Sequence, residues 1–178
     1  MRPITIAAVI VVAVVVVGAG YLLATYMAPG NFGTVRLFMT DPPHYSDNVT
    51  SINITFTQIA LNQVNSTGND TWIVLTSSAT TIDLLQIVNV TQSLGSFKVP
   101  AGNYSQIRFM ATNATAVIDN QIVHLPIPGG AETGLKVHFQ TPFQITVNGI
   151  VTITIDITAD NDGIHNGKLI PSMSATIS

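Results

Sequence analysis

The feature that most restricts how this chain can fold is a continuous apolar segment near its start, from Ile4 to Ala28. The segment carries no charged residue, and Pro29 and Gly30 end it. A spanning helix needs roughly 20 apolar residues, so the segment is long enough to enter a membrane. The chain after Ala28 contains no apolar run of that length.

This apolar leader, residues 1–28, is either retained in the membrane or cleaved. A secretory signal peptide also has a short cationic start, an apolar core and a cleavage site with small residues. Val17, Ala19 and Gly20 provide such a site. Residues 1–19 are therefore expected to be a signal peptide or a membrane anchor. Residues 20–32 are then a linker, a first strand of the same domain, or a strand donated to another copy. The donated strand would use the residues Tyr21, Leu22, Leu23, Ala24, Thr25, Tyr26 and Met27.

The surface chemistry of the chain is unusual, because only 8 % of its residues are charged, against about 25 % in ordinary soluble proteins. The polar positions hold Thr, Asn, Ser and Gln instead, and such a surface changes little in acid. We expect a protein that tolerates low pH. The chain has no cysteine, and its net charge of −3 without a Lys/Arg cluster argues against nucleic-acid binding.

Residues 33–178 show the period-two alternation of β-strands. Val35, Leu37 and Met39 share one face of the first strand, and Asn148 with Gly149 form the strongest hairpin turn. Some ten short strands with frequent turns predict one all-β domain, an immunoglobulin-like antiparallel β-sandwich.

Several local features sharpen this expectation. The apolar parity shifts between Phe56 and Ile59, which indicates a bulge or a change of sheet. Asn120 is expected to take a positive φ in a tight hairpin. Residues 82–87 are the best candidate for a helical turn, with Asp83 as its cap; the alternative is a short strand or an irregular crossing. Residues 160–163 are expected to be a loop. Separate strands are predicted over the ranges 105–111, 116–119, 134–139 and 142–147.

N-glycosylation acceptors are the richest motif of the sequence. Each is an Asn that lies two residues before Ser or Thr with no Pro between. They predict glycosylation of several sites, most of which fall in or beside loops. The candidate positions are Asn48, Asn53, Asn65, Asn69, Asn89, Asn103 and Asn113.

Catalytic and metal-binding motifs are weak. Asp160 and Asp162, with Asp156 and His165 nearby, form a faint calcium candidate, but the Glu that completes a Ca²⁺ loop is missing. A plain turn is the preferred interpretation. No nucleophile elbow, phosphate loop or carboxylate pair is visible. We therefore expect no enzyme activity, no cofactor and no bound metal.

The segment Pro-Ala-Gly-Asn-Tyr-Ser-Gln-Ile-Arg at 100–108 is the most specific of a set of ordered segments that extends from Gly33 to about Ser172. This set resembles a secreted archaeal and bacterial β-sandwich domain family of unknown function. With its low charge and dense acceptor sites, the chain also resembles the glycosylated thread-filament subunits of thermoacidophilic archaea and, more distantly, archaeal bundling pili. The other segments are 33–42, 54–59, 72–75, 81–85, 133–137 and 152–157.

This resemblance implies donor-strand complementation, in which an N-terminal segment of one subunit completes the sheet of its neighbour. We therefore expect a secreted, N-glycosylated subunit of an extracellular adhesive filament or pilus, acting in cell contact or biofilm. Its partners would be other copies of itself in a head-to-tail homopolymer, and the leader would meet the membrane at least transiently. The alternative is a membrane-anchored cell-surface domain that binds a ligand such as carbohydrate.

Overall fold

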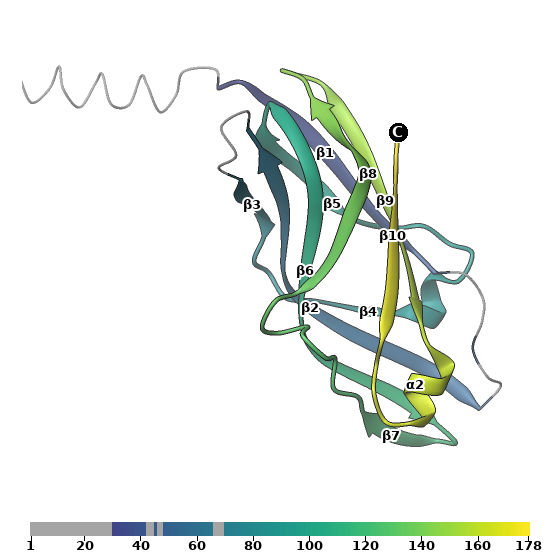
Figure 1. Cartoon of the computed structure of the whole chain (residues 1–178). Helices are drawn as coiled ribbons and strands as arrows, with labels where there is room; N and C mark the ends of the chain where they lie inside the picture. Colours follow the sequence, from purple (N-terminus) through teal and green to yellow (C-terminus); the bar gives the residue numbers. More distant parts are fainter. Residues whose placement is uncertain (1–29, 42–44, 46–47, 66–69) are drawn as a thin grey trace, which may run out of the picture. The chain divides into compact units, whose positions relative to one another are not determined.

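The computed structural model consists mainly of β-strands, which form two sheets (Figure 1). The structure describes residues 30–41, 45, 48–65 and 70–178. The signal peptide or anchor at 1–19 and the candidate donor residues Tyr21–Met27 lie outside the described residues. Phe32–Ser178 form one compact unit. Within the described residues, no helix has the length and apolarity needed to span a bilayer.

The first sheet has four strands in the order β10-β9-β1-β5. β1 lies between β5, with which it pairs antiparallel, and β9, with which it pairs in parallel. β10 pairs antiparallel with β9. The strand bounds are Phe32–Thr40 for β1, Gln92–Pro100 for β5, Ile150–Ala159 for β9 and Pro171–Ile177 for β10.

The second sheet has six strands, built around the long antiparallel pair β2 and β6. β3 and β4 pair with β2, whereas β7 and β8 pair with β6. The bounds are Val49–Val64 for β2, Thr71–Thr76 for β3, Thr80–Asp83 for β4, Gly102–Ile118 for β6, Gln121–His124 for β7 and Leu135–Ile145 for β8.

The two sheets enclose one apolar core, which confirms the predicted mostly-β, two-sheet architecture. Val35, Leu37 and Met39 are fully buried on the inner face of β1, as their spacing predicted. Ile153 and Ile155 play the same part in β9. Burial of apolar surface at period two therefore fixes which face of each strand points inward.

One pairing contradicts the wholly antiparallel sandwich expected from the sequence, because β1 and β9 run in parallel from Thr34–Ile150 to Thr40–Asp156. Parallel neighbours need a long crossover connection rather than a hairpin. Here the connection is most of the domain, so no short turn dictates the direction of β9 beside β1.

Strand lengths also differ from the expectation. The segments 105–111 and 116–119 belong to the single strand β6, and 134–139 and 142–147 largely to β8. β6 continues across an irregularity of its own, because the register from Thr55–Asn113 to Phe56–Ala111 leaves Thr112 of β6 without a partner in β2. Between Phe56 and Gln58 the register with β6 leaves Thr57 of β2 as an extra residue, which confirms the expected bulge in β2.

Two short helices occur in the described chain. Leu84–Ile87 form the 3-10 helix η1, and the Asp83 side chain accepts a hydrogen bond from the Leu85 amide, as predicted. The loop expected at 160–163 is wrong, since Asn161–His165 form the helix α2. Asp160 caps this helix by accepting from the backbone amides of Asp162 and Gly163, which turns a loop-like sequence into a helical turn.

A tyrosine fixes the corner where the chain crosses from β5 in the first sheet to β6 in the second. Tyr104 is fully buried, and its hydroxyl donates to the Pro100 carbonyl at 2.6 Å. Burial raises the pKa of this hydroxyl to about 12. The hydrogen bond back to a carbonyl four residues upstream has the arrangement of a tyrosine corner.

The predicted hairpin at Asn120 is confirmed, because Asp119 and Asn120 have φ of 49° and 60° and β6 pairs antiparallel with β7. The turn predicted at Asn148 is present, with φ of 58°, but the hairpin expected there is wrong, because β8 pairs with β6 in the second sheet whereas β9 belongs to the first sheet. Asn tolerates this left-handed region better than most residues.

Candidate functional site

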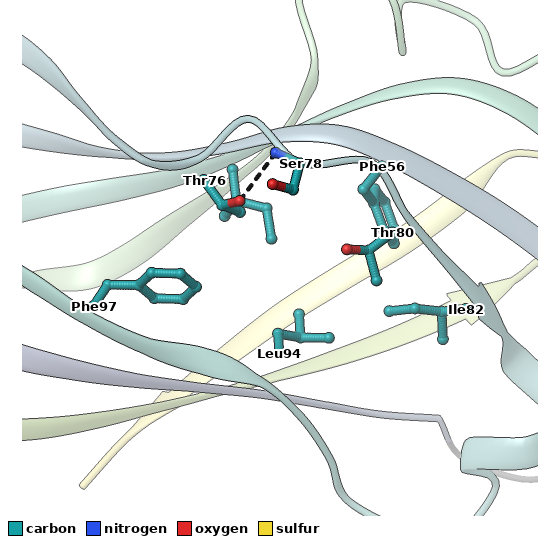
Figure 2. Close-up of a pocket in the computed structure, with 8 residues that line it drawn as sticks. Phe56, Thr76, Ser78, Thr80, Ile82, Leu94 and Phe97 are labelled. Atoms are coloured by element: carbon teal, nitrogen blue, oxygen red, sulfur yellow. Dashed lines mark hydrogen bonds between the residues drawn. The ribbon is translucent and has the colours of Figure 1, made fainter.

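A groove opens between β5, at the edge of the first sheet, and the break between β3 and β4 in the second (Figure 2). Its volume is about 210 Å³. Figure 2 shows side chains from both sheets around it. The lining residues are Phe56, Ile59, Thr76, Ser78, Thr80, Ile82, Leu94 and Phe97.

The groove exists because two short strands share one edge of β2. β4 covers Asn53–Phe56 of β2, and β3 covers Ile59–Gln63. β3 ends at Thr76 and β4 begins at Thr80. Between them, the part of β2 around Thr57 and Gln58 has no described strand on this side, and the groove lies at this gap.

The floor of the groove is apolar and rigid. Phe56 and Ile82 are each 1 % exposed, and Ile59 is 4 % exposed. The Phe56 ring packs edge-on against Phe109 with centroids 5.3 Å apart. Such a floor offers dispersion and hydrophobic contacts to an incoming apolar side chain.

Hydroxyl groups form one rim. The Thr76 hydroxyl accepts a hydrogen bond from the Ser78 amide at 3.1 Å, which holds the turn between β3 and β4 (Figure 2). Thr80 completes this rim. No residue lining the groove is titratable, so the groove offers apolar and hydroxyl contacts and no acid or base.

The other rim is β5, whose bulge directs an apolar side chain into the groove. The register with β1 jumps from Gly95 to Ser93 and leaves Leu94 as the extra residue. Bulges of this kind re-aim a side chain. Gly95 has φ of 138°, and a Cβ there would meet the Phe97 ring at 2.6 Å. Leu94 and Phe97 thus both line the groove.

β5 also leaves one backbone edge open. Among the described strands, it pairs only with β1. The amides and carbonyls of its other edge are therefore free of sheet partners, which makes β5 a template for one more strand.

The acceptor asparagines predicted from the sequence are spread over the surface rather than gathered at one place. Asn53 is half-buried on β2, where its side-chain amide donates to the Ser51 hydroxyl at 2.7 Å. Asn48 is half-buried and contacts the Asp119 carboxylate at 3.4 Å. Asn69 lies outside the described residues. The exposed positions are Asn65, Asn89, Asn103 and Asn113.

The faint calcium candidate has a structural role. The carboxylate oxygens of Asp160 bind the amides of Asp162 and Gly163 at 3.3 Å and 3.1 Å. Across the described part of the chain, no group of three His, Cys, Asp or Glu side chains could hold a metal ion.

A buried carboxyl group was missed by the sequence reasoning. Asp41 is 1 % exposed, its Oδ2 accepts from the Tyr45 hydroxyl at 2.7 Å, and its Oδ1 has no hydrogen-bond partner. Burial, opposed by the Tyr45 hydrogen bond and assisted by the Asp156 charge, raises the pKa of Asp41 to about 6. The Tyr45 hydroxyl also accepts from the Ala159 amide at 3.2 Å. Asp41 follows directly after the predicted strand and lies two residues after Met39, so the alternation places it on the inner face. This spacing was the only indication in the sequence that Asp41 is buried.

The groove was likewise missed. The sequence predicts a strand at 71–76 and a turn at 82–87, but it gives no sign that both approach β5.

Comparison with known proteins identifies a family over most of the compact unit formed by Phe32–Ser178. The family described as Domain of unknown function (DUF4382) matches residues 32–170. No curated protein matches the chain, and no solved structure does. The matched stretch contains every residue that lines the groove.

Proposed function

Since the chain belongs to this family of domains of unknown function, we propose its function from its own residues: it is the structural subunit of an extracellular adhesive filament assembled by donor-strand complementation. The groove beside β5 receives residues 20–31 of the next copy. The observation that carries the proposal is an apolar groove that lies along an unpaired strand edge.

The chemistry of the donor segment suits this groove. Tyr21–Met27 is apolar apart from one Thr and contains no charge. An extended segment would pair its backbone with the open edge of β5, a strand of 9 residues, and would place alternate side chains over Phe56 and Ile82. Only one parity can enter, either Tyr21, Leu23 and Thr25 or Leu22, Ala24 and Tyr26.

Donation between copies produces a fibre. Each copy carries both a donor segment, directly before β1, and an acceptor groove beside β5. The donor segment of one copy enters the groove of a neighbour, whose own donor segment enters the groove of another copy. A head-to-tail contact of this kind does not close on itself and continues as a filament. Residues 1–19 would be removed as a signal peptide, and the mature subunit would be secreted to the cell surface.

The described surface is compatible with a glycosylated extracellular filament subunit. Four acceptor asparagines are exposed, and the proposal has several of them carrying N-linked glycans. No cofactor or metal takes part. The immunoglobulin-like character of the sandwich also belongs to this proposal, and it is supported by the tyrosine corner formed by Tyr104 and Pro100.

One observation favours the alternative of a membrane-anchored, ligand-binding domain. Phe32, Val147 and Ile150 are 44 %, 50 % and 56 % exposed, and Phe32 accepts a hydrogen bond from the amide of Asn148 in the neighbouring turn. They form an apolar tip where the chain enters β1. A retained leader would hold this tip near lipid headgroups.

A substitution at the groove separates the two functions. Leu94→Asp places a charge among the apolar lining residues without removing a fully buried side chain, and we expect it to abolish filaments seen by negative-stain microscopy of cell-surface material. The matched control is Val74→Asp, because Val74 is 50 % exposed on β3 and does not line the groove. Normal filaments from the Leu94→Asp variant would contradict the proposal.

A further inference from the structure

The strands β3, β2, β6 and β8 are successive neighbours in the second sheet (Figure 1). Their register brings long polar side chains together on the outer face of this sheet. Their register forms two adjacent rows. The first row is Trp72, Asn62, Gln106 and His138, and the second is Val74, Ala60, Arg108 and Lys136. We call Trp72, Gln106, Arg108, Lys136 and His138 the cationic platform.

Arg108 is fixed in place on this face. Its guanidinium carbon lies 4.3 Å from the centroid of the Trp72 ring, and its Nε is buried without a hydrogen-bond partner. Stacking on the indole therefore holds the group. Ala60, which lies opposite Arg108 in β2, is fully buried although it belongs to the outer face.

Gly134 lies against the aliphatic part of Arg108. A Cβ at this position, where φ is 73°, would lie 2.6 Å from Cγ of Arg108 and 2.8 Å from the sulfur of Met110. Glycine thus lets the chain approach the aliphatic part of Arg108 closely. Arg108 thus contacts the Trp72 indole through its guanidinium group and approaches the backbone of Gly134 through its aliphatic part.

The charges of the platform are not explained by the fold. Arg108 lies directly opposite Lys136 on antiparallel strands, and like charges in that position destabilise a sheet. The whole chain has only six Lys and Arg residues. Among the described residues, no carboxylate forms an ion pair with either side chain. An anion from outside would relieve this repulsion.

The neighbouring groups indicate which kind of anion. Gln106 and the exposed His138 continue the row beside the two cations, and amide and imidazole groups bind hydroxyls. Nucleic acid fits this surface poorly. Single strands require a basic groove and free aromatic rings for base stacking, whereas one side of the Trp72 ring is already occupied by Arg108 and this surface of the described sheet has no basic groove. The rows span roughly 14 Å across four strands, a length that a few linked sugar rings cover.

We propose that the cationic platform binds an acidic polysaccharide outside the cell. Arg108 and Lys136 bind sugar carboxylates, the first through its forked donors, whereas Gln106 and His138 bind ring hydroxyls. Trp72 is a positioning residue that orients Arg108. The tyrosine corner explains Pro100 and Tyr104 of the segment 100–108, but it does not explain Gln106 and Arg108, which face outward. Polysaccharide binding would give these two residues a function. The site does not depend on polymerisation or on the groove beside β5.

The fluorescence of Trp72 provides a direct assay, because it is the only tryptophan in the chain. The full chain is titrated with oligogalacturonate, with the methyl-esterified form of the same oligosaccharide, and with polyaspartate. We expect a saturable change with oligogalacturonate and none with the other two. A signal of equal strength from the methyl ester would overturn the role of the carboxylates, and one from polyaspartate would overturn the role of the sugar.

Variants then locate the site, with binding measured by calorimetry so that the signal does not require Trp72. Arg108→Ala should weaken binding about tenfold, and Trp72→Phe should weaken it less than Trp72→Ala, because phenylalanine keeps a ring under the guanidinium. Arg36→Ala is the control, since Arg36 is exposed on the first sheet. Circular dichroism checks that each variant is folded. Equal losses from Arg36→Ala and Arg108→Ala would place binding elsewhere and overturn the proposal.

Discussion

Replacing Asp41 with asparagine tests whether one buried carboxyl group makes the fold more stable in acid than at neutral pH. The pKa of Asp41 is raised from 3.8 to about 6. The ionised form is therefore disfavoured in the folded state relative to the unfolded state. Below about pH 4 the group is protonated in both states and there is no penalty, whereas above about pH 6 the penalty is complete.

The magnitude follows from the size of the shift. Each unit of pKa corresponds to about 1.4 kcal/mol, so the free energy of unfolding should fall by about 3 kcal/mol as the pH rises from 3 to 7. The charged or polar groups that act on Asp41 are Tyr45, whose hydrogen bond opposes the shift, and Asp156, whose charge adds to it. Asp156→Asn should therefore make the fall smaller and move it to lower pH.

Urea unfolding between pH 3.5 and 7.5, followed by circular dichroism, measures this effect. Asp41→Asn keeps an oxygen that can accept from Tyr45, so we expect it to raise stability at pH 7 and to remove most of the pH dependence. It should leave stability at pH 3.5 nearly unchanged. A natural chain that is more stable at pH 7 than at pH 4, with a parallel curve for Asp41→Asn, would refute the reasoning.

Three substitutions test the local geometry, with thermal or urea unfolding as the measurement. Tyr104→Phe removes the hydroxyl that donates to Pro100 and should cost about 1–3 kcal/mol; a cost near zero would show that the corner does not need the bond. Asp160→Ala removes the cap of α2 and should cost about 1 kcal/mol, with Asp162→Ala, which caps nothing, as its control. Gly134→Ala should cost more than about 1 kcal/mol and shift Trp72 fluorescence, and an unchanged spectrum would contradict the packing of Arg108.

Much of the fold could be predicted because burial and turn chemistry are local signals. The alternation of Val35, Leu37 and Met39 identifies an inner face, and Asn148 with Gly149 marks a turn whose backbone angle is dictated by neighbours in the chain. The bulge in β2 was visible as a change of parity. These features depend on residues within one strand or turn.

The rest depends on contacts between distant segments, which a single sequence does not contain. The parallel pairing of β1 with β9 and the approach of Leu94 to Ser78 join parts of the chain with no local relationship. Asp160 was misjudged because its role as a cap depends on α2 forming at all. The stack of Arg108 on Trp72 requires the register of three strands, so neither residue stood out in the sequence.

Cross-linking tests most directly whether one copy fills the groove of another, because the natural chain has no cysteine. Chains with Leu23→Cys or Leu22→Cys are co-assembled with chains that carry only Ser78→Cys, a residue of the groove rim, and oxidised. We expect a disulfide-linked pair from one of the two parities, and none when Ser174→Cys on the outer face of β10 replaces Ser78→Cys. Filaments that form normally but give no link to Ser78→Cys from either parity would contradict strand donation into this groove.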